Sequence, residues 1–192
     1  MKITGLETFQ IPQFPLSLFL RVHTDEGLVG LGESTNQPDA IEGAVHGFLA
    51  PRVLGREAED IEALWNELYA ATNYQGSAGA ELRALSALDI ALWDLMGKRT
   101  GQPLYRLFGG KVRPSVTIYN TCGSHGGRIH GRSDDRWFLE DAGTLAEDLL
   151  KSGIRAMKIW PFDPLAAKTH GQSIRAEDLP RVFEKGFTGY NG

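Results

Sequence analysis

The sequence predicts two parts of different fold class: an α+β domain in residues 1–110 and a βαβ unit in residues 111–192. Two patterns carry this prediction. In the first third of the chain, apolar and polar residues alternate as in half-buried antiparallel strands, and a helical period then takes over. After residue 111 the order is strand, helix, strand, which indicates parallel strands joined by a right-handed crossover.

The first third of the chain has the pattern of a three-stranded antiparallel meander. Residues 2–11 are rich in β-formers, and residues 16–23 place a leucine or a valine at every even position. Residues 25–27 supply a hairpin turn, after which residues 28–33 return as a third strand. The clean alternation of the second strand predicts one buried face and one exposed face.

Three helices are predicted to follow the sheet. The first two lie near residues 38–49 and 59–71. The third begins near residue 80, places leucines at the spacing i, i+3, i+7 and i+10, and is expected to stop near Gly97. Its wide apolar arc predicts a helix buried on most sides. A short further helix is expected to start at Pro103.

Asp89 interrupts the apolar face of the third helix. It lies one turn after Leu85 and one turn before Leu92. Because a carboxylate on an apolar face needs a partner, we expect Asp89 to be buried and paired, with Arg83 or Arg99 as candidate partners. Its replacement by alanine is then expected to cost roughly 3–5 kcal/mol of stability.

The second part of the chain contains the strand, helix and strand of the predicted βαβ unit. Residues 115–121 form the first strand, residues 137–152 the helix and residues 154–160 the second strand. A long loop, residues 122–136, separates the first strand from the helix. Beyond residue 160 the pattern is less regular, with a further short helix expected at residues 176–185.

The composition excludes several classes of protein. Hydrophobic residues make up 42% of the 192 residues and charged residues 23%, which is typical of a soluble globular protein. The net charge of −4 and the scattered basic residues argue against nucleic acid binding. No apolar run has the length of a membrane span or a signal peptide. The single cysteine, Cys122, fits a reducing compartment, so we expect a cytoplasmic protein.

Residues 84–110, ALSALDIALWDLMGKRTGQPLYRLFGG, carry a family resemblance. This stretch resembles the last capping-domain helix and the crossover of the enolase superfamily, in its mandelate racemase/muconate-lactonizing branch. The resemblance implies an α+β capping domain in residues 1–110 and the start of a (β/α) TIM-type barrel in residues 111–192, incomplete after about two βα units. It also implies Mg²⁺-assisted removal of a proton α to the carboxylate of a small acid or acid sugar, and a homo-oligomer.

The ends of the predicted barrel strands are candidate sites, because barrel enzymes carry their reactive groups at the carboxyl ends of strands. Lys158 is the leading catalytic candidate. The segment around it resembles the family's second-strand motif, in which two lysines are separated by one residue, and a desolvated lysine can act as a base. Trp160 stands at the second lysine position. Lys158 could therefore be an acid/base, a carboxylate-binding cation, an electrostatic support or an ordinary ion-paired lysine.

Four further residues are candidate substrate contacts. Asn120 ends the first predicted barrel strand, His125 follows it in the loop, and Trp160 ends the second strand. Tyr74 lies in the polar loop 72–79, which in the resembled family folds over the mouth of the barrel. Structural readings stay open for three of them: a solvated loop residue for Tyr74 and His125, and an aromatic core plug for Trp160.

The resemblance implies Mg²⁺ for the complete enzyme, held by an Asp and two Glu on the third to fifth barrel strands. We expect no Mg²⁺ to be held by this chain alone, because the only carboxylate near a predicted strand end is Asp163. The expected activity is that of an acid-sugar dehydratase or a racemase. The alternative is a catalytically inactive structural or oligomerisation module that keeps only the cap.

Overall fold

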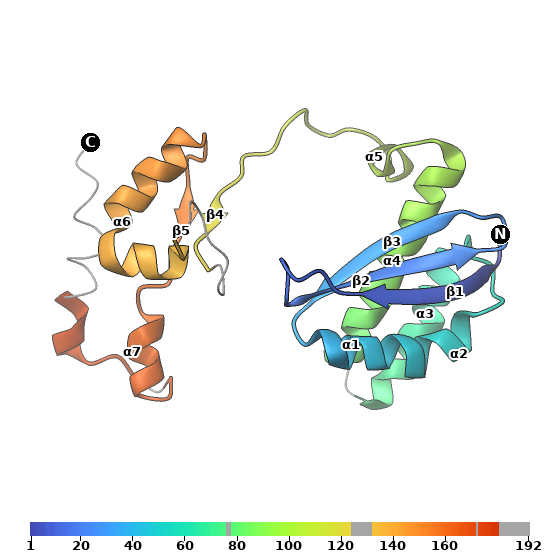
Figure 1. Cartoon of the computed structure of the whole chain (residues 1–192), viewed down its shortest axis with the longest axis horizontal. Helices are drawn as coiled ribbons and strands as arrows, with labels where there is room; N and C mark the ends of the chain where they lie inside the picture. The colour runs from blue at the N-terminus through green and yellow to red at the C-terminus, as the bar shows by residue number, and fades with distance from the viewer. Residues whose placement is uncertain (76–77, 124–131, 172, 181–192) are drawn as a thin grey trace. The chain divides into compact units, whose positions relative to one another are not determined.

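The computed structural model describes residues 1–75, 78–123, 132–171 and 173–180 (Figure 1). The chain separates into two compact units, Met1–Val112 and Arg113–Gly192, and each is described by itself. Within the described residues, no helix combines the length and the apolar character that crossing a bilayer requires.

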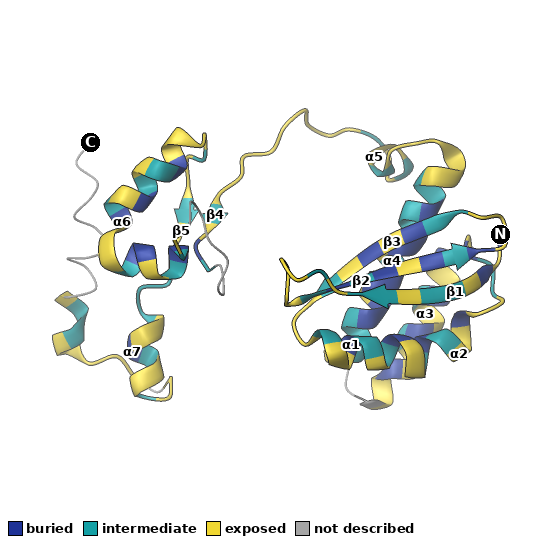
Figure 2. Ribbon diagram, in the orientation of Figure 1, coloured by how far each residue is buried: buried dark blue, intermediate teal, exposed yellow. Residues whose placement is uncertain are grey.

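The first unit is built on a three-stranded antiparallel sheet. Its order is β1 (Ile3–Phe9), β2 (Ser17–Thr24), β3 (Val29–Thr35), which confirms the expected meander. In the central strand β2, Leu18, Leu20 and Val22 are buried, and the side chains between them are partly or fully exposed (Figure 2). One face of the sheet therefore supplies the core.

Helices cover the buried face of this sheet (Figure 1). The helices of this unit are α1 (Pro38–Ala44), the π-helix η1 (Val45–Leu49), α2 (Ala50–Val53), α3 (Ile61–Thr72), the 3-10 helix η2 (Asn73–Gln75), α4 (Ala80–Thr100) and α5 (Leu104–Leu107). Of these, α1, α2 and α4 pack on the strands, whereas α3 and α5 pack on α4. The expectation that the long helix stops at Gly97 was wrong. It continues to Gly101, whose left-handed backbone (φ 63°) ends it at no steric cost, since glycine has no Cβ.

Helix α4 packs directly on strand β3 because two glycines of the strand face it. A Cβ atom built on Gly30 would lie 2.2 Å from the carbonyl oxygen of Ala91, and one on Gly32 would lie 1.9 Å from that of Ala87. Any side chain at either position would thus collide with the helix backbone. The facing residues of α4, Ala87 and Ala91, are also small, so the backbones of α4 and β3 are in direct contact.

Side chains of α4 also bind the outer edge of β3. Asp94 Oδ2 accepts a hydrogen bond from the Leu31 amide at 2.8 Å. Lys98 Nζ donates to the Val29 carbonyl oxygen at 2.7 Å and to Asp94 Oδ2 at 2.7 Å. One turn of helix therefore satisfies backbone groups that an edge strand would otherwise leave open to another strand.

The expectation that Asp89 is buried and paired was wrong. Its side chain is half-buried, and no described residue forms a hydrogen bond or an ion pair with it. Arg83 instead donates to the Thr35 carbonyl oxygen at 2.7 Å, and Arg99 pairs with glutamates elsewhere. Partial burial raises the pKa of the Asp89 carboxyl, and the like charge of Glu62 raises it further. The carboxylate avoids full burial by lying at the rim of the apolar face.

The second unit contains the expected βαβ arrangement. Its elements are β4 (Asn120–Thr121), α6 (Asp134–Lys151), β5 (Met157–Lys158), α7 (Asp163–Lys168) and the 3-10 helix η3 (Ala176–Asp178). Strands β4 and β5 are parallel, and α6 packs on them through a core made of Cys122, Trp137, Phe138, Ala142, Leu145 and Leu149. The small parallel sheet is the start of the barrel that the sequence led us to expect.

Both barrel strands are shorter than predicted. In the described part of the chain only residues 120–121 and 157–158 are paired, whereas strands were expected at 115–121 and 154–160. A strand is stabilised by its neighbours, and among the described residues each of these two strands has one neighbour and one open edge. The apolar side chains of Val116 and Ile118 are accordingly exposed. Of the helix expected at 176–185, η3 forms the start, and residues 181–185 lie outside the described residues.

Candidate functional site

The carboxyl ends of β4 and β5 lie side by side in the second unit. Asn120 pairs with Met157 and Thr121 with Lys158, and the amide of Cys122 continues the ladder by donating to the Lys158 carbonyl oxygen at 2.9 Å. The residues that follow the two parallel strands therefore gather at one edge of the small sheet. This is the edge at which barrel folds place their functional groups.

Lys158 and Trp160 meet at this edge. The Lys158 ammonium nitrogen lies 4.6 Å from the centroid of the Trp160 ring, within the range of a cation–π contact. Lys158 is exposed and Trp160 is half-buried. No carboxylate of the described residues lies within ion-pair distance of Lys158. The reading of Lys158 as an ion-paired structural lysine thus gains no support from the described residues.

Asn120 links the end of β4 to the start of α6. Its side-chain amide donates to Asp134 Oδ2 at 3.2 Å and contacts Cys122 Sγ at 3.2 Å. Asp134 is buried in the first turn of the helix. In this structure the amide nitrogen of Asn120 therefore holds strand and helix together, and a contact to substrate stays a prediction.

Cys122 is a core residue at this edge. Burial raises the pKa of its thiol, the hydrogen bond from Asn120 opposes this, and the Asp134 carboxylate raises the pKa further. The thiol is therefore protonated at neutral pH, and a protonated, buried thiol is a poor nucleophile. Cys122 packs here as a small apolar side chain.

A cavity of about 420 Å³ opens next to Trp160. Its walls come from the end of β4, the first turns of α6 and the start of α7. It is lined by Cys122, Gly123, Asp135, Arg136, Phe138, Leu139, Trp160, Asp163 and Pro164. Apolar walls with a few charged groups at the rim are typical of small-molecule sites.

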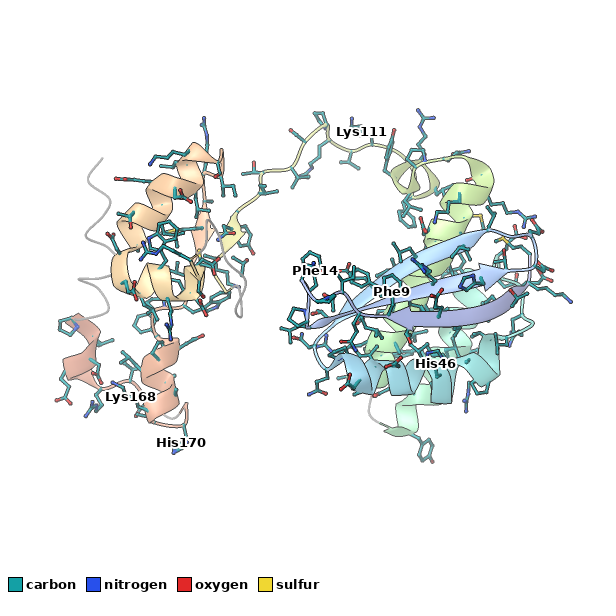
Figure 3. All side chains as sticks on the ribbon, viewed as in Figure 1. Phe9, Phe14, His46, Lys111, Lys168 and His170 are labelled. Atoms are coloured by element: carbon teal, nitrogen blue, oxygen red, sulfur yellow. The ribbon has the colours of Figure 1, made fainter. Side chains whose placement is uncertain are left out.

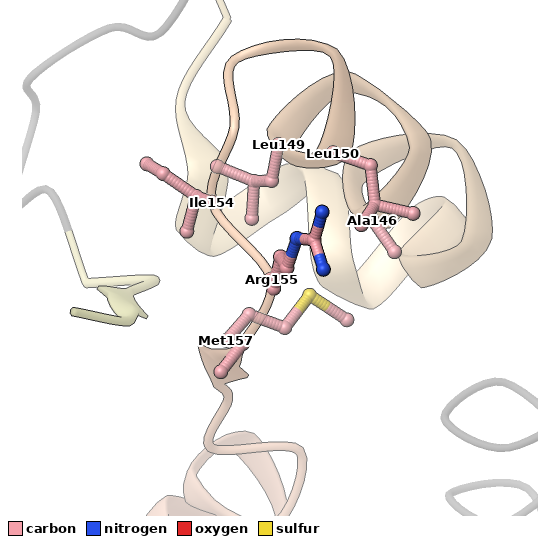
Figure 4. Close-up of a pocket in the computed structure, with 7 residues that line it drawn as sticks. Ala146, Leu149, Leu150, Ile154, Arg155 and Met157 are labelled. Atoms are coloured by element: carbon pink, nitrogen blue, oxygen red, sulfur yellow. The ribbon is translucent and has the colours of Figure 1, made fainter. Parts of the chain in front are cut away.

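A second, smaller cavity of about 230 Å³ lies at the other end of β5 (Figure 4). It is formed by the last turns of α6 and the segment that leads into β5, and its lining is apolar apart from Arg155. Because it lies at the amino end of the strand, it belongs to the part of a barrel that normally serves stability.

One predicted contact belongs to the first unit, and another is not among the described residues. Tyr74 lies in η2 of the first unit and its side chain is fully exposed, at 104% of the reference area. The loop between β1 and β2 carries Phe14, which is also exposed (Figure 3). His125 falls outside the described residues. Of the five candidates, the structure brings together Lys158 and Trp160, with Asn120 on the neighbouring strand.

The described residues contain no group of three or more His, Cys, Asp or Glu side chains that could hold a metal ion. Mg²⁺ prefers near-octahedral coordination by oxygen, usually with carboxylates. The donors present do not fit such a site, and we derive no step through a metal held by these residues.

Sequence reasoning missed two residues of this edge, Asp134 and Gly123. The helix was expected to begin at residue 137, whereas α6 begins at Asp134. The signal was available in the run Ser133-Asp134-Asp135, since serine is favoured before a helix and acidic residues in its first turn. Gly123 carried no signal, because its role depends on the aromatic ring of Trp160, which follows β5.

A family model decides the relationship of the chain to known proteins. The model of the mandelate racemase/muconate lactonizing enzyme N-terminal domain matches residues 13–109. The chain belongs to this family.

Curated relatives of this mandelate racemase/muconate lactonizing enzyme family member are sugar-acid dehydratases. It is 42% identical over 125 residues to the D-galactonate dehydratase of Verminephrobacter eiseniae, covering 64% of this chain and 32% of the relative. It is 32% identical over 175 residues to the D-mannonate dehydratase of Rhizorhabdus wittichii, covering 90% of this chain and 40% of the relative. The chain thus spans well under half the length of these enzymes.

Solved structures agree with this assignment. An enolase of the mandelate racemase subgroup from Agrobacterium tumefaciens has a TM-score of 0.79 and 43% identity, covering 96% of this chain and 45% of that protein. An enolase from Pantoea ananatis, solved with bound D-gluconate and Mg, has a TM-score of 0.56 and 34% identity, covering 62% of this chain and 30% of that protein. The expected fold class, a capping domain followed by the beginning of a barrel, is confirmed for this family member.

Proposed function

We propose that this chain supplies the capping domain and the first barrel strands of an acid-sugar dehydratase. The observation that carries the proposal is the position of Lys158 at the shared carboxyl edge of two parallel strands, in cation–π contact with Trp160, which lines a cavity of about 420 Å³. The similarity to galactonate and mannonate dehydratases supports an acid-sugar substrate. The Mg²⁺ in the gluconate-bound relative supports Mg²⁺ as the cofactor of the complete enzyme.

The proposed reaction is an elimination of water. The proton at C2, α to the carboxylate, leaves first, and the hydroxyl at C3 then departs with a proton as water. The resulting enol tautomerises to a 2-keto acid, so atoms and charges balance. Removal of the α-proton puts negative charge on the carboxylate oxygens, and a nearby ammonium stabilises that charge.

Lys158 is the group of this chain that we assign to the substrate carboxylate. Its ammonium offers three N–H donors, and no described carboxylate competes for them. A lysine in such a place can act as a fixed cation or can transfer the α-proton. Tyr74, Asn120 and Trp160 are further candidate substrate contacts, and His125 stays a candidate outside the described residues.

The decisive test replaces Lys158 in a complete enzyme that carries this segment. Lys158→Ala should lower kcat/KM for acid-sugar dehydration by about 100-fold or more, as is typical of a lost acid–base or charge-stabilising group. Lys151→Ala is the matched control, because Lys151 lies at the exposed end of α6. The formation of the 2-keto acid measures the reaction, and unchanged turnover would leave Lys158 without a role in it.

Exchange of the C2 proton in D₂O separates dehydration from racemisation. A dehydratase releases water and a keto acid, whereas a racemase incorporates deuterium at C2 and keeps the C3 hydroxyl. If neither occurs with any acid sugar, the second candidate holds: a structural or oligomerisation module. That candidate is favoured by the first unit, which has a complete core of its own, while β4 and β5 pair over two residues each.

A further inference from the structure

The Trp160 ring and the Lys158 ammonium form a pair just after β5. Lys158 is the last residue of the strand, and Trp160 follows two positions later. The ammonium lies 4.6 Å from the ring centroid. At this distance the negative face of the indole attracts the cation, and the attraction strengthens where solvent is partly excluded, as it is around the half-buried Trp160.

The Trp160 ring packs against the backbone of Gly123, which has no side chain in the way. A Cβ atom built on Gly123 would lie 2.6 Å from Cζ3 of Trp160 and 3.1 Å from Cη2. The backbone of Gly123 is held in turn, because its amide donates to the Thr121 carbonyl oxygen at 2.9 Å. Gly123 has no left-handed φ, so its backbone conformation does not demand glycine. Glycine is required here because the indole ring of Trp160 fills the space that a Cβ atom would occupy.

We propose that Trp160 is a positioning residue for Lys158: its ring, seated against Gly123, holds the ammonium group at the carboxyl edge of the two strands. The proposal rests on the proposed function in one respect, that the ammonium meets a substrate carboxylate. In this proposal Trp160 acts by positioning Lys158, and Gly123 acts by leaving room for the Trp160 ring.

The arrangement has a chemical advantage over an ion pair. A carboxylate partner would neutralise Lys158 and occupy its N–H donors, so an incoming anion would have to compete with it. The face of an aromatic ring stabilises the cation without accepting strong hydrogen bonds from it. The ammonium is thereby held in one place while its donors stay available for a carboxylate.

The experiment reads the position of Lys158 in the 192-residue chain without any substrate. In lysine-labelled protein, NMR should find the ε-CH₂ protons of one lysine shifted upfield of all others by the ring current of the indole. Lys158→Met removes that signal and so assigns it. The matched pair is Trp160→Phe, which keeps an aromatic face, and Trp160→Leu, which keeps apolar volume without one.

The proposal expects the upfield signal to persist in Trp160→Phe, to vanish in Trp160→Leu and to move in Gly123→Ala, where the ring must shift. The methyl signals of Leu145 and Leu149 should be unchanged in all variants, which shows that the unit remains folded. An unshifted Lys158 signal in the parent chain, or the same shift in Trp160→Leu, would overturn it. Because no turnover is measured, this result is independent of whether the complete enzyme proves to be a dehydratase.

Discussion

Asp89 and Asp94 show that the position of a carboxylate on one helix decides whether it finds a partner. Both are carboxylates on α4, and they are five residues apart. Asp94 reaches the Leu31 amide and Lys98, whereas Asp89 meets no partner among the described residues. The sequence pattern correctly placed Asp89 on the apolar side of the helix. It could not show that the carboxylate lies at the rim of the contact between α3 and α4 and stays partly exposed.

We expect Asp89→Asn to stabilise the protein at neutral pH. The folded state raises the pKa of this carboxyl above its usual 3.8, so the folded state disfavours the charged form. The penalty is absent below the unfolded pKa, grows as the pH rises through the folded pKa, and is complete at neutral pH. Because the side chain is only half-buried, the gain should not exceed about 1 kcal/mol.

Chemical denaturation at a series of pH values measures this gain as the difference in unfolding free energy between Asp89→Asn and the parent. The difference should be near zero at the lowest pH and should level off above the folded pKa. Glu62→Gln should give a smaller gain, since it removes the second cause only. A loss of stability in Asp89→Asn at neutral pH would contradict the structure.

At the scale of the elements, the contact between α4 and β3 leaves no room for a side chain on the strand residues that face the helix. A side chain at position 32 would place its Cβ 1.9 Å from a backbone oxygen, which no change of rotamer can relieve. We therefore expect Gly32→Ala to cost about 3 kcal/mol, at the upper end of overpacking effects. Gly43→Ala is the control, because nothing lies near that position in α1 and alanine favours the helix.

Thermal and denaturant unfolding of the two variants give the comparison directly. Gly43→Ala should be neutral or slightly more stable than the parent. If Gly32→Ala were equally harmless, the close approach of helix and strand in this structure would be wrong.

The elements that the sequence predicted well are those fixed by local pattern. Strand β2 alternates because one face is buried, and its neighbours follow from short turns, so the meander could be read in advance. The strand at residues 115–121 has the same local pattern, but only residues 120–121 are paired. Pairing depends on a partner strand, and local pattern cannot supply one. For the same reason, Lys158 could be proposed from sequence, whereas its contact with Trp160 could not.

At the scale of the whole molecule, the two units differ in how completely they cover their apolar surface. The first has a sheet packed under several helices and one large core. In its described residues the second has two short strands, each with an open edge, and exposes Val116, Ile118 and Leu150. Open edges and exposed apolar side chains recruit partners.

We expect the 192-residue chain to self-associate through residues 115–160. Light scattering at increasing protein concentration measures this as a rising mean mass. Replacing Val116 and Ile118 by lysine should lower that mass, since charges on an open strand oppose pairing. The control is Leu31→Lys, which also replaces an exposed apolar side chain by lysine but does so on the exposed face of the cap sheet. A monodisperse monomer at all concentrations would contradict this expectation.

The polar contacts from α4 to the edge of β3 also allow local motion of the helix to be observed by amide hydrogen exchange. The amide proton of Leu31 belongs to an edge strand, yet it is bound by Asp94 on the helix. It exchanges with solvent hydrogen when the hydrogen bond to Asp94 opens, through rotation of the Asp94 side chain or local separation of α4 from β3. Its exchange rate therefore reports how often this contact between α4 and β3 breaks, independently of any ligand or activity.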